Sequence, residues 1–268
     1  MQVTDDLALL IEAARESGQI ARRFFGKAPE TWDKGDDAGP VTEADLAINA
    51  MLRSELTTNR PDYGWLSEES EDDQARLKAD NVFIIDPIDG TRAFIAGEKH
   101  FSHSLAVAKR GKTVAAAVYV PMLDLLFIAQ DGDPAALNGD EIQTSETRDL
   151  DGATVLAAKP NLDPVHWIGP VPNFARKFRP SLAYRLCLVA QGKYDAMLTL
   201  RDCWEWDIAA GDLIVRQAGG RVTDRQDDQL MFNNPNPKTK GCLAGGLSIH
   251  AALQSRLKHR STAFAQKN

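Results

Sequence analysis

Two carboxylates, Asp86 and Asp89, lie at the end of an apolar run, Val82–Ile85, and are followed at once by Gly90 and Thr91. The run is typical of a buried strand, and carboxylates at its end are costly unless positive charge compensates them. Carboxylate oxygens suit Mg²⁺, which binds few protein ligands and shares the oxygens of a substrate phosphate. A helix starting just after them would offer the amides of Gly90 and Thr91 to a phosphate. For this motif alone, a turn in which both aspartates cap backbone amides remains an alternative.

Three other acidic motifs stand at distant positions of the chain. Glu68 and Glu69 are adjacent after a short apolar run, an arrangement that by itself fits a solvated loop. Asp207 opens a predicted helix, where it would stabilise the positive end of the helix dipole. Asp45 follows Thr42 at the spacing of a capping box. Each motif has a local explanation, but together they offer enough carboxylates to hold divalent cations.

Composition limits the classes of partner. The 268 residues are 43% hydrophobic and 26% charged, as in an ordinary globular protein, and the length allows one large domain or two modest ones. A formal net charge of −7 argues against a nucleic-acid polymer as partner. It does not exclude a small anionic substrate, because a bound cation reverses the local sign.

Cysteine usage and hydropathy indicate the compartment. Cys187, Cys203 and Cys242 are odd in number and widely spaced, which argues against a disulfide framework or a Cys-type zinc site. The segment Met1–Asp6 is acidic and does not read as a secretory signal. The longest apolar stretch, Thr113–Ala129, is interrupted by a proline and an aspartate. We therefore expect a cytoplasmic protein without a membrane span.

Hydrophobic periodicity places these motifs on elements. It predicts helices at 7–25, 42–56, 181–191, 206–218 and 248–258, the last capped by Ser248, and strands at 64–66, 82–85, 104–108, 114–120, 125–129, 155–158, 194–200 and 221–224. Residues 26–40 read as a polar loop. The pattern predicts an α+β N-terminal lobe (1–140) that carries most of the metal ligands. An α/β C-terminal lobe (141–268) would supply Asp207 and the substrate contacts.

The motifs, in this order, resemble those of the inositol monophosphatase superfamily. They are Pro40–Asp45, Ser67-Glu68-Glu69-Ser70, Asp86-Pro-Ile-Asp89-Gly-Thr91, Asn138-Gly139 and Trp206-Asp207-Ile-Ala-Ala-Gly211. The resemblance extends from about Leu7 to the C-terminal helix. It implies an α/β fold, an alternating αβαβα layered sandwich, and metal-dependent hydrolysis of small phosphate monoesters. It further implies Mg²⁺ as cofactor, two to three ions per site, inhibition by Li⁺, and a homodimer.

The resemblance also implies the metal ligands. Glu68, Asp86 and the carbonyl of Ile88 would hold one ion. Asp86, Asp89 and Asp207 would hold a second, and Glu68 would help to hold a weaker third. All of these ligand atoms are oxygens, as Mg²⁺ prefers.

Other residues receive catalytic or binding roles by the same resemblance. Thr91, together with Glu68, would orient a water molecule activated by the metal, and Asp45 would lie near the third ion through water. The amides of Gly90 and Thr91 would contact the phosphate. Lys34 lies on the loop that in the family closes near the metals.

The substrate is less constrained than the chemistry. Arg92-Ala93-Phe94 after the central motif and Leu200, where inositol monophosphatases carry an acidic residue, both weaken myo-inositol phosphate as the dedicated substrate. Ser181 and Arg185 are predicted substrate contacts, and Arg185 matches a basic position of similar bisphosphate nucleotidases. An arginine binds phosphate oxygens bidentately, although a solvated helix cation is the plain alternative. The sequence favours 3′-phosphoadenosine 5′-phosphate or inositol monophosphate, with histidinol phosphate as a further alternative.

The expected reaction is direct attack by water on a phosphate monoester, without a phosphoenzyme, because such dianions need charge neutralisation and alignment more than a covalent intermediate. A noncatalytic metal-binding or phospholigand-binding protein is the alternative of another class. His100 and His103 follow the central motif, and we expect surface or packing roles for them, since Mg²⁺ prefers oxygen ligands.

Overall fold

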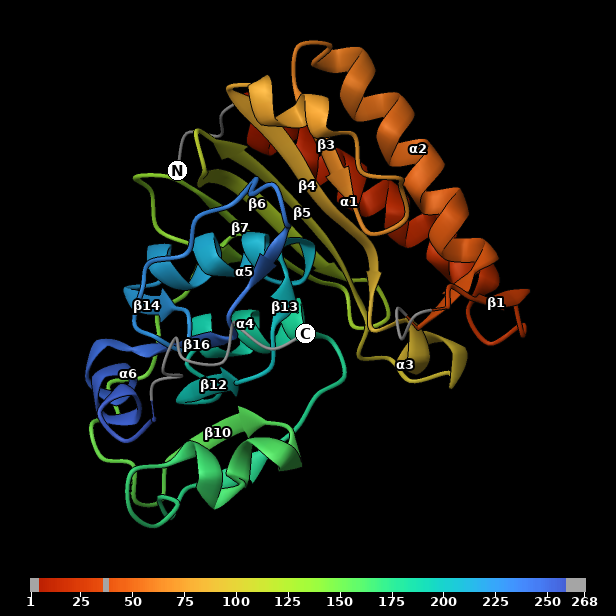
Figure 1. Cartoon of the computed structure of the whole chain (residues 1–268). Coiled ribbons are helices and arrows are strands. Elements are labelled where there is room, and N and C mark those ends of the chain that lie inside the picture. Colours follow the sequence, from red (N-terminus) through yellow and green to blue (C-terminus); the bar gives the residue numbers. More distant parts are fainter. Residues whose placement is uncertain (1–4, 36–38, 259–268) are drawn as a thin grey trace, which may run out of the picture.

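The computed structural model describes residues 5–35 and 39–258, and residues 1–4 of the acidic N-terminal segment lie outside these ranges. Helices and sheets alternate in layers (Figure 1). Two long helices cover one face of a seven-stranded sheet, and two central helices lie between that sheet and a five-stranded sheet. The C-terminal helix packs on the outer face of the five-stranded sheet. The predicted αβαβα sandwich is therefore confirmed.

The first half of the chain builds the long helices and the seven-stranded sheet, whose strand order is β3-β4-β5-β6-β7-β8-β9. The elements are α1 (Asp5–Phe24), β1 (Thr31–Asp33), β2 (Pro40–Thr42), α2 (Glu43–Asn59), β3 (Gly64–Ser67), the 3₁₀ helix η1 (Gln74–Lys78), β4 (Asn81–Asp89), α3 (Thr91–Ile95), β5 (Ser102–Lys109), β6 (Lys112–Val120), β7 (Leu125–Gln130), β8 (Ala136–Leu137) and β9 (Asp140–Glu141).

Strand β4 carries the central motif and is buried on both faces. Val82 and Ile84 face the central helices, whereas Phe83 and Ile85 face α1 and α2, because successive side chains of a strand point to opposite sides. Both faces are covered, which explains the uninterrupted apolar run. Strand β3 pairs with β4 in parallel, and Ser67 lies opposite Ile85. The residues that follow β3 therefore lie beside Asp86.

The second half builds the five-stranded sheet and its helices. Its elements are β10 (Thr154–Ala157), the 3₁₀ helices η2 (Lys159–Leu162) and η3 (Pro164–His166), β11 (Ala175–Lys177), α4 (Leu182–Ala190), β12 (Ala196–Thr199), β13 (Cys203–Trp204), α5 (Glu205–Gln217), β14 (Gly220–Thr223), β15 (Lys238–Thr239), β16 (Cys242–Gly246) and α6 (Leu247–Gln254). The strand order is β11-β10-β12-β16-β14. The core around α4 and α5 contains residues from both halves, and the division into lobes at residue 140 stays a prediction.

Several details differ from the sequence expectations, and three of them bear on the arrangement of the elements. The segment 26–40, expected to be a loop, contains strand β1, which pairs with β2 from Pro40 onwards. Strand β16, which pairs with both β12 and β14, was not predicted. The expected cap of the last helix is wrong: Ser248 lies inside α6, which starts at Leu247 after Gly246.

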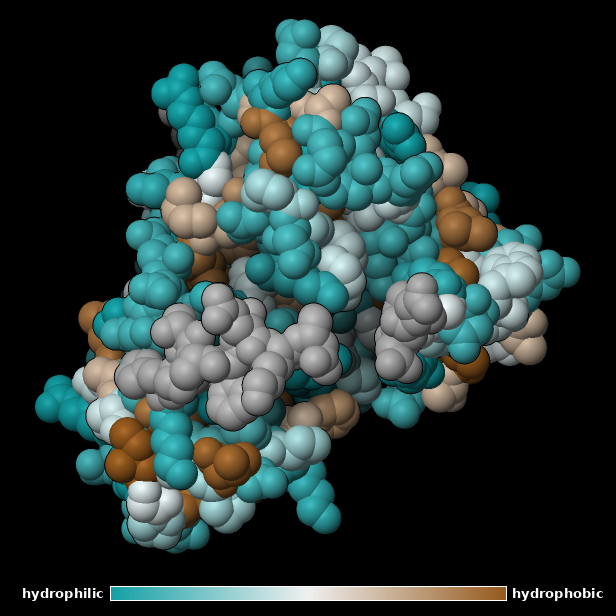
Figure 2. All heavy atoms as spheres, in the orientation of Figure 1, coloured by the Kyte–Doolittle hydropathy of each residue, from teal (hydrophilic) through white to brown (hydrophobic). Residues whose placement is uncertain are grey.

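The surface and the cysteines agree with the compositional reading. On the face shown in Figure 2, hydrophilic residues predominate and hydrophobic ones occur in small separate groups. All three cysteines are buried and free. Among the described residues, no helix combines the length and apolarity needed to cross a bilayer.

One glycine sets the distance between the two central helices. Gly211 of α5 faces α4, and a Cβ atom added there would overlap the side chain of Leu186. We expect Gly211→Ala to lower the free energy of unfolding by about 1–3 kcal/mol, as overpacking of a core does. Urea denaturation measures this change. The control is Glu16→Ala on the exposed face of α1, and an equal loss in both variants would contradict the packing argument.

Candidate active site

Three carboxylates from distant parts of the chain converge where the two sheets meet the central helices. Asp86 and Asp89 lie at the end of β4, and Asp207 lies in the first turn of α5. One oxygen of each lies within 4.8 Å of the others. Within residues 5–35 and 39–258, this is the only such group of three potential metal ligands. The predicted convergence of these aspartates is therefore present in the fold.

The electrostatics of this trio call for a cation. Burial raises the pKa of Asp86, Asp89 and Asp207, and the neighbouring carboxylates raise those of Asp86 and Asp207 further. Hydrogen bonds from Ser181 and Ala183 oppose the effect of burial at Asp89, so that the pKa of Asp89 is raised only to about 6. Asp86 Oδ1 is buried and has no hydrogen-bond partner among the described residues. An all-oxygen set with an unsatisfied oxygen fits Mg²⁺, whose charge would relieve both costs.

Parallel strand pairing places Glu68 next to the trio. Its backbone N–H donates to the carbonyl of Ile85 at 3.2 Å, which extends the β3–β4 pairing by one residue. Lys34 Nζ donates to Glu68 Oε1 at 2.7 Å and to Glu69 Oε1 at 2.8 Å. Burial raises the pKa of Glu69 to about 7. Burial alone would lower the pKa of Lys34, but Glu68 and Glu69 together hold it above its usual value.

Sequence reasoning quoted Glu69 only as the neighbour of Glu68 and gave it no role. The sequence signal for a role of Glu69 was its position next to Glu68 at the end of a strand. Adjacent side chains there point in different directions, so that when one carboxylate faces the site the other needs a separate partner for its charge. That partner is Lys34, which thereby comes from the β1–β2 connection to the edge of the carboxylate group.

Thr91 and Asp45 lie together behind the turn. Thr91 Oγ1 is 3.1 Å from the carbonyl oxygen of Ile88 and 3.3 Å from Asp45 Oδ1. Asp45 forms the predicted capping box with Thr42 at the start of α2. Burial raises the pKa of Asp45 to about 6. Gly90, between Ile88 and α3, has φ of +100°, a conformation that glycine adopts without strain.

Ser181 supports a predicted metal ligand. It caps α4, is fully buried, and its hydroxyl donates to Asp89 Oδ2 at 2.6 Å. The N–H of Ala183 donates to the same oxygen at 2.6 Å, and Ser102 Oγ lies 2.9 Å from Ser181 Oγ. In this geometry Ser181 orients Asp89, and its direct contact with a substrate stays a prediction.

Arg185 faces the site from α4 and is not the solvated cation of the plain alternative. It is 7% exposed, its guanidinium stacks on Phe178 at 4.4 Å, and Nε donates to the carbonyl of Arg179. Burial lowers the pKa of Arg185 to about 10, although Asp89 and Asp207 act to raise it. A buried guanidinium next to the acidic trio is a suitable partner for an anionic group of a ligand.

A cavity of about 1060 Å³ opens onto these residues. Of the predicted site residues, those that line it are Glu68, Asp86, Ile88, Asp89, Gly90, Thr91, Arg185 and Asp207. Asp45, Ser181 and Lys34 do not line it but are hydrogen-bonded to Thr91, Asp89 and Glu68.

Several cavity residues were missed by sequence reasoning. Most come from the second half, among them Asn161, His166, Arg179, Arg201 and Arg225, and His100 comes from the first half. No local sequence signal marks them, because arginine and histidine in loops are ordinary surface residues.

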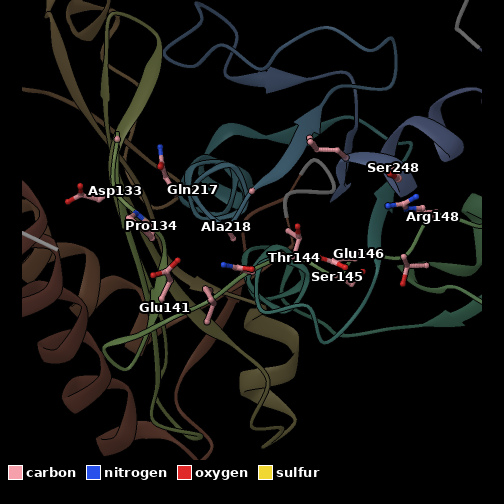
Figure 3. A pocket seen from close by; sticks show the side chains of 16 residues that line it. Asp133, Pro134, Glu141, Thr144, Ser145, Glu146, Arg148, Gln217, Ala218 and Ser248 are labelled. Atoms are coloured by element: carbon pink, nitrogen blue, oxygen red, sulfur yellow. The ribbon is translucent and has the colours of Figure 1, made fainter.

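A second cavity, of about 620 Å³, has no such chemistry. It lies between segments 132–134 and 141–148 and the adjoining ends of α5 and α6 (Figure 3). Loop residues such as Asp133, Thr144 and Glu146 line it together with Gln217 and Ala218 at the end of α5. None of the predicted site residues contributes to it.

A buried network fixes the start of α5. Glu205 is fully buried and accepts hydrogen bonds from the N–H groups of Asn233 and Asn234 at 2.6 and 3.0 Å. Arg76, in η1 of the first half, donates to Asn233 Oδ1 and to the carbonyl of Asn234. The first turn that carries Asp207 is thereby connected to both halves of the chain.

Comparisons with known proteins agree with this geometry. A model of the inositol monophosphatase family matches residues 3–262. The inositol-1-monophosphatase of Rhizobium meliloti (strain 1021) is 33% identical over 232 residues, 82% of this chain and 85% of the relative. The Nus factor SuhB of Escherichia coli (strain K12) is 34% identical over 228 residues, 81% of this chain and 84% of the relative.

Solved structures show the same fold. The Thermotoga maritima IMPase superposes with a TM-score of 0.81 at 28% identity, covering 94% of this chain and 96% of that one. The extragenic suppressor protein suhB from Bartonella henselae gives 0.79 at 29% identity, covering 94% and 98%. The chain belongs to the inositol monophosphatase family, and it is a phosphatase, a phosphoric monoester hydrolase.

The raised pKa values predict how Mg²⁺ binding depends on pH. Between the ordinary pKa of 3.8 and the value of about 6 at Asp89, the metal-free folded state binds protons that the unfolded chain does not. The metal-free protein therefore gains stability from this group as the pH falls through about 6, and protons would compete with a bound cation such as Mg²⁺. We expect the Tm difference between Mg²⁺ and EDTA samples to be largest above pH 7 and to shrink by pH 5.

Differential scanning fluorimetry at several pH values measures that difference. The Asp89→Asn variant should lose most of it at every pH. Asp212→Asn, which removes another buried carboxylate with a raised pKa, should retain it because Asp212 lies outside the trio. A Tm difference that does not change with pH would contradict the competition.

Proposed function

We propose that this member of the inositol monophosphatase family is a Mg²⁺-dependent phosphomonoesterase that hydrolyses a small phosphate monoester by direct attack of water. The observation that carries the proposal is the buried trio Asp86, Asp89 and Asp207 at a cavity large enough for a small phosphorylated molecule. One oxygen of Asp86 has no hydrogen-bond partner in the part of the chain that the structure describes. Only a bound cation makes such a site compatible with a phosphate dianion.

The site residues have two proposed roles: some would hold Mg²⁺ ions, and others would orient the attacking water molecule and the phosphate. Asp86, Asp89 and Asp207, with Glu68 and the carbonyl of Ile88, would hold two to three Mg²⁺ ions. Bound Mg²⁺ would supply a Lewis acid that lowers the pKa of water and offsets the charge of the phosphate. Li⁺ would inhibit by competing for these oxygens.

Thr91 and Glu68 would orient the attacking water molecule. The Thr91 hydroxyl is fixed between the Ile88 carbonyl and Asp45, which supports this role because its oxygen is already positioned before a ligand binds. The amides of Gly90 and Thr91 would contact the phosphate. Lys34, bound to Glu68 and Glu69, would balance their charge from the β1–β2 connection.

For the substrate we propose 3′-phosphoadenosine 5′-phosphate or inositol monophosphate, with histidinol phosphate as the alternative. The buried Arg185 and the neighbouring Arg201 at the cavity support a substrate with a second anionic group. The name of the Rhizobium meliloti relative supports inositol 1-phosphate. We further propose a cytoplasmic homodimer that acts on small molecules and binds neither a nucleic-acid polymer nor a membrane.

A noncatalytic metal-binding or phospholigand-binding protein is the competing class, and the Nus-factor name of several relatives is compatible with it. Such a protein has no need of groups that orient water. Both Glu68 and Thr91 are present and lie at the cavity, which favours catalysis.

Removing the charge of Glu68 tests catalysis directly. We expect Glu68→Gln to lower kcat by about 10²–10⁴-fold, the usual contribution of a positioned acid or base, while the fold is retained. The measurement is Mg²⁺-dependent phosphate release by a malachite-green assay, with circular dichroism as a check of folding. Glu71→Gln, three residues away and exposed, is the matched control. Activity that survives both Glu68→Gln and EDTA would refute the proposed function.

Removing the charge of Arg185 tests the substrate class. We expect Arg185→Gln to lower kcat/KM for 3′-phosphoadenosine 5′-phosphate by about 10- to 100-fold, the value of a charge-assisted hydrogen bond, and to leave inositol 1-phosphate hydrolysis nearly unchanged. Arg176→Gln on the exposed strand β11 is the control. An equal loss for both substrates would mean that Arg185 acts only through the structure of the site.

A further inference from the structure

A β-bulge separates two of the proposed metal ligands. Asp86 pairs with Ser104 of β5 and Asp89 pairs with Ser102, so that Pro87 and Ile88 on β4 stand opposite one residue, His103, on β5. Bulges of this kind bend a strand and redirect its side chains and carbonyls. Here the bulge sets the spacing of Asp86 and Asp89, and the carbonyl of Ile88, which has no paired residue on β5, accepts a hydrogen bond from Thr91 Oγ1.

His103 contacts the bulge through one hydrogen bond. Its Nδ1 lies 2.5 Å from the carbonyl oxygen of Pro87. A carbonyl oxygen only accepts, so Nδ1 is the protonated donor in this contact. Pro87 has no N–H, and its carbonyl is therefore the group through which β5 can bind the bulge at this residue.

The ring of His103 is held firmly in place. The side chain is fully buried, with the Phe101 ring centroid at 6.1 Å and the Tyr119 ring centroid at 6.4 Å. Nε2 is buried and has no hydrogen-bond partner among the described residues. An imidazole whose second nitrogen is left unsatisfied in an apolar core is costly, and a leucine or phenylalanine would pack there without that cost. The single bond to Pro87 is what the histidine adds at this position.

We propose that His103 is a positioning residue for the metal site: its Nδ1–H···O=C bond to Pro87 holds the bulge that sets the spacing of Asp86 and Asp89 and the direction of the Ile88 carbonyl. The inference rests on the proposed function, because it assigns those oxygens to Mg²⁺. His103 itself does not contact the ligand atoms and acts only through the backbone of the turn.

The test compares two substitutions of His103 in the full chain. His103→Phe keeps an aromatic ring but loses the donor, and His103→Asn keeps an N–H donor near the position of Nδ1. Mg²⁺ binding is measured by isothermal titration calorimetry, which does not depend on activity. We expect His103→Phe to raise the Kd for Mg²⁺ by about 10-fold or more, as loss of a group supporting a metal ligand does, and His103→Asn to stay close to wild type.

A matched variant separates positioning from general stability. Val107 lies on the same strand, four residues after His103, and its side chain belongs to the core under α1 and α2. The Val107→Ala variant removes volume from that core. It should lower Tm without changing the Kd for Mg²⁺. The proposal is overturned if His103→Phe binds Mg²⁺ like wild type, or if Val107→Ala weakens binding as much as His103→Phe does.

Two further outcomes remain distinguishable. If His103→Phe does not fold, His103→Gln replaces it, since its longer side chain moves the donor away from the Nδ1 position. Equal Mg²⁺ affinity of His103→Gln and His103→Asn would then overturn the proposal. If wild type itself shows no saturable Mg²⁺ binding, the proposed function fails, and the role of His103 fails with it.

Discussion

Repulsion between buried carboxylates is the constraint on which the rest of this structure depends. Two unit charges at the 4.8 Å limit of the Asp86, Asp89 and Asp207 oxygens repel by roughly 3 kcal/mol at an effective dielectric constant of about 20. Three such pairs consume a sizeable part of the stability of a typical domain. The fold must therefore hold these side chains together against their charge, and only a cation or protons can remove the cost.

Two of the proposed metal ligands, Asp89 and Asp207, are supported by contacts from different elements. Ser181 and the N–H of Ala183, at the start of α4, hold Asp89. Glu205 anchors the first turn of α5, which carries Asp207, to a loop that Arg76 also binds. Because these supports come from both halves of the chain, the site forms only when the halves pack together. The central helices α4 and α5 pack against both sheets and thereby join the two halves (Figure 1).

The sequence predicted the elements whose signal is local and strong, and it missed those whose signal is spread over distant partners. Strand β4 follows from a continuous apolar run, and the capping box of Asp45 follows from a spacing of three residues. Strand β16 lacks such a signal because it ends in Gly245 and Gly246, which weaken a strand by themselves. Side chains there would collide with Ile249 and with the carbonyl of Ser145, so close packing explains the glycines only once the fold is known. The interaction of Ser181 with Asp89 likewise joins residues that are 92 positions apart.

The cavity is lined by two groups of residues: the proposed metal ligands and the residues that would contact the substrate. All proposed metal ligands except Asp207 come from the ends of β3 and β4, whereas much of the remaining lining comes from the segments after β10 and β12 and from α4. Strand ends in a two-sided core tolerate little change, because the side chains on both faces of the sheet are packed against helices there. Loops tolerate substitution and insertion much better. A change at the exposed Arg201 can thus alter the ligand that fits without moving the carboxylates. The proposed metal site would therefore be compatible with different phosphate monoesters within one fold.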